Sequence, residues 1–321
     1  MNVLSKDYQQ KWQGNNLLTP KMWELFRKNR IKAHNGINNP ISSQACCMNF
    51  WYPFITEEQK ENLRDFLEVF GIKAQKILTF KPNSTFYDCI YPDSGNVLFE
   101  WIGPIRSPIG ENDGYMRGHQ RTSIDAYILA KINNRVTQIL IEWKFTESYS
   151  SRHNTGKFLG AKGIERLARY APIIAKYREW GKEILFNLDE IDYWGLYDIC
   201  YEPFYQLLRQ HLLAQETLGR RFGDYYIEDY IIMHLSHSQN HKLNILTENQ
   251  AEYSKGLAKH VGREIHEIWH GLLSNGHKNK FIGEYWDLCF QKYKIPPELN
   301  CWGDYISERY VGTPEHVKIS A

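Results

Sequence analysis

Asp125 and the triplet Glu142-Trp143-Lys144 supply two carboxylates and one ammonium group. Two carboxylates on one small patch can bind a hard divalent cation, and Mg²⁺ takes only one or two of them from a protein. An ammonium group beside them can stabilise negative charge that develops on a substrate. These residue types therefore indicate metal-assisted hydrolysis, provided that the fold brings them together. The alternative is an ordinary Asp/Glu/Lys cluster on a surface hairpin.

A β-hairpin would bring the three side chains together. Residues 124–131 and 136–145 are apolar stretches that each read as a strand. Asn133-Asn134 lies between them, and Asn tolerates the positive φ that a two-residue hairpin turn demands. The sequence therefore predicts two antiparallel strands joined by a tight turn.

The register of this hairpin puts Asp125 directly opposite Glu142. Opposed side chains share a sheet face and lie about 5 Å apart at Cβ. Lys144, two residues beyond Glu142, points to the same face. Alternation assigns the opposite face to the core through Ile139, Ile141, Trp143 and Phe145. Like charges opposed on a buried face destabilise a sheet, so a bound cation would remove a repulsion that the hairpin otherwise carries.

Asp125 followed by Ile141-Glu142-Trp143-Lys144 resembles the catalytic signature of the PD-(D/E)XK nuclease superfamily. Residues 121–125 and 141–149 look like bacterial restriction-endonuclease-like proteins of that superfamily, and residues 201–210 look like a further segment of the same group. The resemblance is strong over about residues 95–150, fair to about 240 and weak at either end. Ile124 stands where the name-giving Pro would precede the Asp, a departure that is common in the superfamily.

The resemblance implies an α/β fold with a restriction-endonuclease-like αβββαβ core, in which helices flank a mixed central sheet. It also implies that Asp125, Glu142 and the carbonyl of Trp143 hold Mg²⁺, with Mn²⁺ as a substitute, and that Lys144 assists the attacking water. The implied substrate is DNA, in restriction or other bacterial defence. Many superfamily members dimerise to cut both strands, so a homodimer stays open.

Three further polar residues could support this site. Glu100 lies on a predicted strand, residues 97–102, whose apolar residues on both faces predict a central position. An inward-looking carboxylate there needs a partner, either Lys144 or the metal, unless the strand is shorter and Glu100 is exposed at its edge. Gln206 and Gln210 share one face of a predicted helix that begins near Pro203. In the superfamily, polar residues on this helix often support the active site; a surface glutamine pair is the alternative.

A basic, glycine-bearing segment follows the second strand. Residues 150–163 carry Arg152, Lys157 and Lys162, which could contact phosphates of a nucleic acid. A solvated loop is the alternative. A helix is predicted next, and Pro172 should break or restart it.

His266-Glu267-Ile268-Trp269-His270 matches the H-E-x-x-H pattern of zinc proteases. On a helix, His266 and His270 would share a face and could bind Zn²⁺, with Glu267 as general base. The longer pattern with Gly and a third His does not fit, because Leu273 stands where Gly should be. A zinc metalloprotease is therefore one alternative function, and a polar helix face beside the core is the structural one. A nucleic-acid-binding protein that does not cleave is a third hypothesis, which the presence of both carboxylates and the lysine disfavours.

Composition sets outer limits on these hypotheses. The formal net charge of +2 is too small to indicate nucleic-acid binding by itself. The first residues lack the apolar core of a secretion signal and no apolar run could span a bilayer, so we expect a cytoplasmic protein without membrane contact. Residues 230–235 predict a fourth strand, which completes the αβββαβ order. We expect one domain over residues 1–321, with its core at about 56–240, a partly helical amino-terminal elaboration and a mainly helical extension at about 245–321.

Overall fold

The computed structural model describes residues 16–29, 31–81, 84–86, 89–91, 95–112, 121–149, 160–179, 184–187, 198–199, 201–251 and 255–311. Within this part of the chain, no helix is both long enough and apolar enough to cross a membrane.

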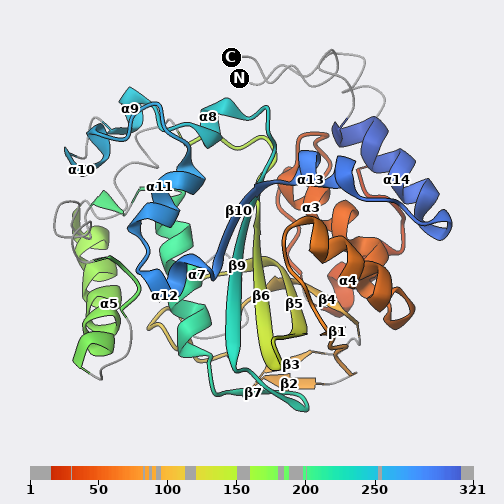
Figure 1. The fold of residues 1–321 in the computed structure, drawn as a ribbon, viewed down its shortest axis with the longest axis horizontal. Helices are drawn as coiled ribbons and strands as arrows, with labels where there is room; N and C mark the ends of the chain where they lie inside the picture. Colours follow the sequence, from red (N-terminus) through yellow and green to blue (C-terminus); the bar gives the residue numbers. More distant parts are fainter. Residues whose placement is uncertain are drawn as a thin grey trace.

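A mixed, six-stranded sheet forms the centre of the fold (Figure 1). Neighbours in the sheet follow the order β1-β5-β6-β9-β10, and β4 pairs with β5. β5 runs antiparallel to β1, β4 and β6, whereas β6, β9 and β10 run parallel. The bounds of these strands are Lys76–Ile77 (β1), Val97–Trp101 (β4), Ile124–Ile132 (β5), Arg135–Trp143 (β6), Asp229–Ser236 (β9) and Phe281–Tyr285 (β10). The predicted fold class is confirmed.

Helices cover both faces of this sheet (Figure 1). On one side lie α3 (Ser43–Trp51), α4 (Lys60–Val69), α13 (Trp286–Lys292) and α14 (Asn300–Ile306). On the other lie α5 (Gly160–Glu179), α7 (Phe204–Glu216), α11 (Ile265–Leu272) and α12 (Asn275–Lys278). The remaining helices are α2 (Met22–Lys28), α8 (His241–Asn244), α9 (Glu248–Ala251) and α10 (Lys255–Ala258). A smaller sheet joins β2 (Ser84–Phe86), β3 (Cys89–Tyr91), β7 (Arg221–Phe222) and β8 (Tyr225–Tyr226).

Each face of the sheet has its own hydrophobic core, because side chains alternate along a strand. The α7-side core takes Tyr127, Leu129 and Leu140 from the hairpin and packs them against residues such as Leu208 and Ile268. The α3-side core takes Ala126, Ile141 and Trp143 and packs them against residues such as Phe50 and Trp286. The hairpin is therefore buried on both faces, as its apolar composition predicts.

The turn of the hairpin has the predicted geometry. Asn133 and Asn134 adopt φ of 48° and 63°, and Ile132 pairs with Arg135. The register continues to the pair Ala126–Ile141. The ladder ends at this pair, and Asp125 and Glu142 are the next residues on the two strands.

The position of β4 differs from the prediction. Among the described strands it pairs only with β5, so it is not central in the sheet. Its apolar residues on both faces have another reason: Leu98 and Trp101 enter the α7-side core, whereas Val97 and Phe99 enter the α3-side core.

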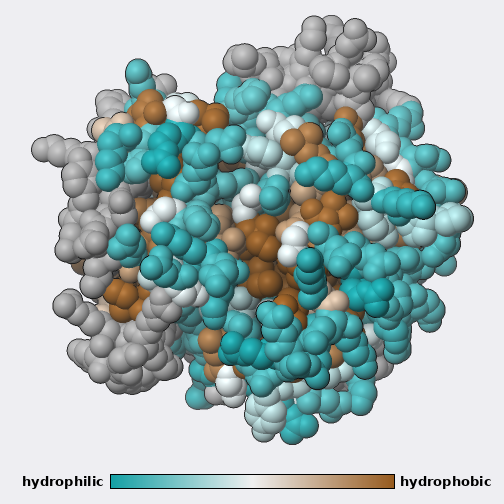
Figure 2. Space-filling model, viewed as in Figure 1, coloured by the Kyte–Doolittle hydropathy of each residue, from teal (hydrophilic) through white to brown (hydrophobic). Residues whose placement is uncertain are grey.

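One further expectation about secondary structure is wrong, and another is incomplete. α5 continues through Pro172, because the turns around the proline are held by packing of Leu167, Tyr170 and Ile173 against the α7-side core. The region after residue 245 is mainly helical, as predicted, but it also contributes β10 to the central sheet. Figure 2 shows apolar side chains gathered in the middle of the face where Figure 1 draws β9 and β10, and Ile282 of β10 is only partly buried.

Candidate active site

The open end of the β5–β6 hairpin holds the two predicted carboxylates. The side chain of Asp125 accepts a hydrogen bond from the backbone N–H of Trp143, at 2.7 Å from Oδ2. This bond ties the end of β5 to the end of β6, where the regular pairing has stopped. The Glu142 side chain lies on the neighbouring strand and is buried.

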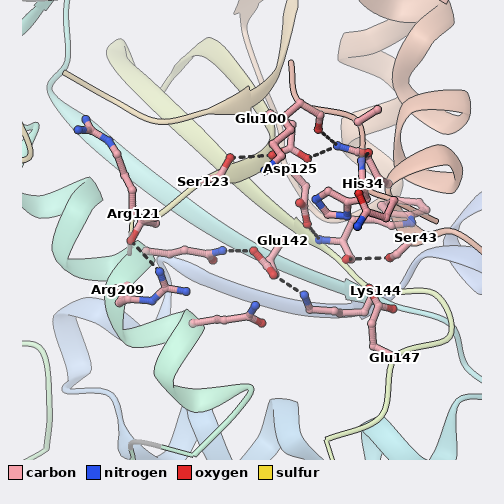
Figure 3. Close-up of a pocket in the computed structure, with 18 residues that line it drawn as sticks. His34, Ser43, Glu100, Arg121, Ser123, Asp125, Glu142, Lys144, Glu147 and Arg209 are labelled. Atoms are coloured by element: carbon pink, nitrogen blue, oxygen red, sulfur yellow. Dashed lines mark hydrogen bonds and ion pairs between the residues drawn. The ribbon is translucent and has the colours of Figure 1, made fainter. Parts of the chain in front are cut away.

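Glu142 is held by two donors from different elements (Figure 3). The ammonium of Lys144 forms an ion pair with Oε1, and the amide of Gln210 on α7 donates to Oε2. Lys144 is also buried. The structure therefore brings Asp125, Glu142 and Lys144 of the hairpin region together with Gln210 of α7, which lies 68 residues after Glu142 in the chain.

Glu100 reaches the same place from β4, and Lys144, one of its two expected partners, makes no ion pair with it. Its backbone has a φ of 50°, in the left-handed region, and its side chain is buried. Gln44 donates to Oε1 and Ser123 donates to Oε2, each at 2.8 Å. The expected alternative partner, Lys144, is paired with Glu142 instead.

The electrostatics of the site favour a bound cation. Burial raises the pKa of Asp125 well above its usual value, and the negative charges of Glu142 and Glu100 raise it further, against the opposing effect of Lys144. Burial acts to lower the pKa of Lys144, but the neighbouring Glu142, Tyr149 and Glu147 raise it well above its usual value. Lys144 is thus held as an ammonium ion, whereas burial and the neighbouring carboxylates disfavour the ionised form of Asp125, which a bound cation would restore.

These side chains open into a pocket of about 480 Å³ (Figure 3). Its lining includes the carboxylates, Lys144 and both predicted glutamines. Gln206 accepts a hydrogen bond from the hydroxyl of Tyr149 at 3.1 Å. The pocket walls also include residues that the sequence did not point to, namely Lys32, His34, Ser43, Gln44, Arg121 and Arg209.

The predicted basic segment is not part of this lining as far as it is described. Lys162 lies on α5, is exposed and does not line the pocket. Arg152 and Lys157 lie outside the described residues.

The donor set suits a hard divalent cation. Two carboxylates meet there, and their mutual repulsion is what a cation would neutralise. The carbonyl of Trp143 faces the same pocket and accepts a hydrogen bond from the hydroxyl of Ser43 at 3.3 Å. Neither here nor elsewhere in the described ranges do three His, Cys, Asp or Glu side chains gather as a metal site. A cation at the hairpin would therefore rely on two carboxylates, this carbonyl and water.

The H-E-x-x-H segment does form a helix, α11, but its histidines do not converge. Nε2 of His266 lies 2.8 Å from Nδ1 of His234 on β9, and the two rings contact each other, with His234 buried and His266 partly buried. Glu267 and His270 are exposed. The described part of the chain offers no three-residue ligand set for zinc around them. His266 is thus explained by packing against the sheet, and nothing in the geometry supports the protease hypothesis.

Comparison with known proteins gives one match. The model of a family described as Restriction Endonuclease associating with ARP matches residues 2–282. No curated protein matches the chain, and no solved structure matches it. The matched residues include the whole hairpin, Glu100, Gln206 and Gln210.

Proposed function

The chain belongs to the family of restriction endonucleases described as associating with ARP, and we propose that it is a metal-dependent endonuclease of PD-(D/E)XK type that hydrolyses phosphodiester bonds in DNA. The observation that carries this proposal is the convergence of Asp125, Glu142 and Lys144 at one end of a buried hairpin, facing an open pocket. Family membership alone supports a nuclease-like role; the residues add the chemistry.

Asp125, Glu142 and the carbonyl of Trp143 would hold Mg²⁺, or Mn²⁺ as a substitute. When bound, such an ion polarises the scissile phosphate and lowers the pKa of a coordinated water. The protein contributes a rigid frame for this set, because the Trp143 N–H fixes Asp125 and Gln210 fixes Glu142. Both contacts leave the carboxylates directed at the pocket (Figure 3).

Lys144 would act on the reacting groups. Its raised pKa keeps it protonated, so it orients the attacking water or stabilises charge as it develops on the phosphate, rather than removing a proton. Its ion pair with Glu142 places the ammonium beside one carboxylate of the acidic pair.

Glu100 and Gln206 would position this machinery. Glu100 adds a third buried carboxylate whose oxygens are both held by donors. Gln206 holds the Tyr149 hydroxyl, and the Tyr149 ring lies 5.9 Å from the Lys144 ammonium.

Cleavage of supercoiled plasmid and of single-stranded DNA with Mg²⁺ or Mn²⁺ tests the proposal. We expect wild type to cleave and Lys144→Ala to lose cleavage, with thermal melting confirming that the variant is folded. Glu267→Ala, which removes an exposed carboxylate of the H-E-x-x-H helix, is the matched control and should cleave as wild type does. Full activity in folded Lys144→Ala would remove this residue from the mechanism.

A further inference from the structure

One wall of the pocket comes from a loop near the amino terminus, far from the hairpin in sequence. Residues 32–35 line the pocket, and the side chains of Lys32 and His34 are exposed. Figure 3 shows His34 on the same side of the pocket as Ser43, close to the carboxylate end of the site. The loop is anchored at both ends, because Ile31 and Ile37 are buried in the α3-side core.

Gln44, in the first turn of α3, holds this loop with its side-chain amide. Nε2 donates to the carbonyl of Lys32 at 3.1 Å, and Oε1 accepts from the N–H of His34 at 2.9 Å. Nε2 of Gln44 also donates its second hydrogen to Oε1 of Glu100, at an N–O distance of 2.8 Å. An amide has two donors, and both are engaged here, so its orientation is determined. Gln44 therefore joins the loop to the acidic cluster.

The basic side chains of the pocket differ in whether they are already paired with other groups of the protein. Lys144 is paired with Glu142, and Arg209 lies 3.7 Å from Glu111. The guanidinium of Arg121 donates to the backbone carbonyls of Ile102, Ile105 and Asn112. Lys32 and His34, by contrast, make no side-chain hydrogen bond or ion pair with any part of the chain that the structure describes. Both side chains are therefore available to donate to an anion.

From this we infer that the loop of residues 32–35 binds the phosphate backbone of the nucleic acid beside the bond to be cut. The inference rests on the proposed nuclease function and adds the groups that grip its substrate. The carboxylates that line the pocket, those of Glu100, Asp125, Glu142 and Glu147, repel a polyanion. A phosphate next to the scissile one therefore needs cations that are not already neutralised. Lys32 would donate to a phosphate oxygen and His34 would add a second N–H donor. Gln44 is a positioning residue, since it fixes the loop relative to Glu100.

Binding of a fluorescein-labelled DNA duplex, measured by anisotropy over a series of salt concentrations, tests this loop. Ca²⁺ replaces Mg²⁺ so that binding is measured without turnover. Lys32→Gln removes one phosphate contact, so the slope of log K against log[salt] should become shallower by about 1. Affinity at 0.1 M salt should fall roughly tenfold, whatever the duplex sequence. Lys73→Gln makes the same charge change at an exposed position away from the pocket and should leave the slope unchanged.

Gln44→Leu tests whether the loop acts through its anchor. It should make the slope of log K against log[salt] shallower, as Lys32→Gln does. The double variant Lys32→Gln/Gln44→Leu should bind DNA about as tightly as whichever single variant has the lower affinity, because both changes remove the same contact. Melting temperatures identify any loss of folding.

An unchanged slope in Lys32→Gln overturns the inference, as does an equal change in Lys73→Gln or a failure of wild type to bind the duplex. The first two outcomes leave the nuclease proposal intact, because that proposal depends on cleavage, whereas a wild type that binds no duplex counts against both. A wild-type protein that binds through Lys32 but cuts no DNA would sustain the inference about the loop and remove the proposed reaction.

Discussion

Two buried polar clusters lie in a single row across the central sheet. Glu142 on β6 is paired with His234 on β9, which is paired with Gly283 on β10. His266 of α11 packs over Gly283 so closely that a Cβ there would lie 2.4 Å from its Cγ. One cluster contains the acidic pair and Lys144, and the other contains the two histidines.

The two clusters differ in the charge that their side chains carry when buried. At the acidic end, burial and Glu142 raise the pKa of Asp125 and so disfavour its ionised form, whereas Lys144 keeps its charge beside the pocket. At the histidine end, burial lowers the pKa of His234 and brings that of His266 to about 4. The second cluster is therefore a neutral pair.

Both clusters contain residue spacings that metal sites use, so spacing does not separate them. The difference lies in the surroundings. A cation beside the pocket would offset the repulsion between Asp125 and Glu142. The neutral imidazole pair shares one hydrogen bond and has no like charges to offset. Substitutions in each cluster test this electrostatic difference.

The largest expected difference is between Glu142→Gln and Glu267→Gln. Loss of the buried carboxylate removes a metal ligand and the partner of Lys144, so cleavage should fall by roughly 10²- to 10³-fold. The exposed Glu267 should be replaceable without loss of cleavage, and with a change in stability within about 0.5 kcal/mol. Single-turnover cleavage of plasmid DNA measures both. Equal losses in the two variants would make the hairpin no more important than α11.

The next effect is the pH dependence of folding at the histidine pair. The unfolded His pKa is about 6.5, and burial brings that of folded His266 to about 4. Because the folded state prefers the neutral ring, this contribution is full above pH 6.5 and is lost as pH falls toward 4. The loss amounts to about 3 kcal/mol at most.

Urea unfolding across that pH range provides the measurement. His266→Gln should flatten part of the decline, whereas His270→Gln, at an exposed position, should leave it unchanged. A decline that is identical in wild type and His266→Gln would show that His266 is not held neutral by the fold.

A smaller effect tests the packing of His266 against β10. Gly283→Ala should destabilise the protein by about 1–3 kcal/mol, because its new methyl group overlaps the imidazole. The same change at Gly271 of α11 meets nothing within 4 Å and should be neutral or stabilising by about 0.5–1 kcal/mol. Chemical denaturation measures both. Adding His266→Ala should restore most of the loss in Gly283→Ala, and simple additivity of the two changes would argue against this contact.

The sequence predicts those parts of the fold that follow from local rules. The hairpin register depends only on Asn133 and Asn134 adopting positive φ and on alternation along two strands, and the structure confirms both. β10 is different, because five residues among helices become a strand only by parallel pairing with β9, whose residues are about fifty positions earlier. Pro172 misleads for a related reason: its local cost of about 3 kcal/mol is offset by packing that the sequence does not display.

The site, too, contains residues that a local sequence motif identifies and residues that only tertiary packing brings in. Glu142 and Lys144 are two residues apart, and one turn brings Asp125 to them, so a motif can contain all three. Gln44 meets Glu100 across 56 positions of sequence, through the packing of α3 on the sheet, and its glutamine side chain has no distinctive local pattern. The partner of Glu100 could not be derived before that packing was known.

We would titrate Mn²⁺ into wild type and into Asp125→Asn by calorimetry, and measure the melting temperatures of both proteins without metal. These measurements test whether the hairpin binds a cation through Asp125. The new amide can still accept from the Trp143 N–H while it removes a negative charge facing Glu142. We predict that the variant loses the binding heat and that, without metal, it melts at a higher temperature than wild type. The opposite result is a variant that binds Mn²⁺ as wild type does and that, without metal, has a lower melting temperature than wild type. It would contradict both the role of Asp125 as a metal ligand and its destabilising effect in the metal-free protein.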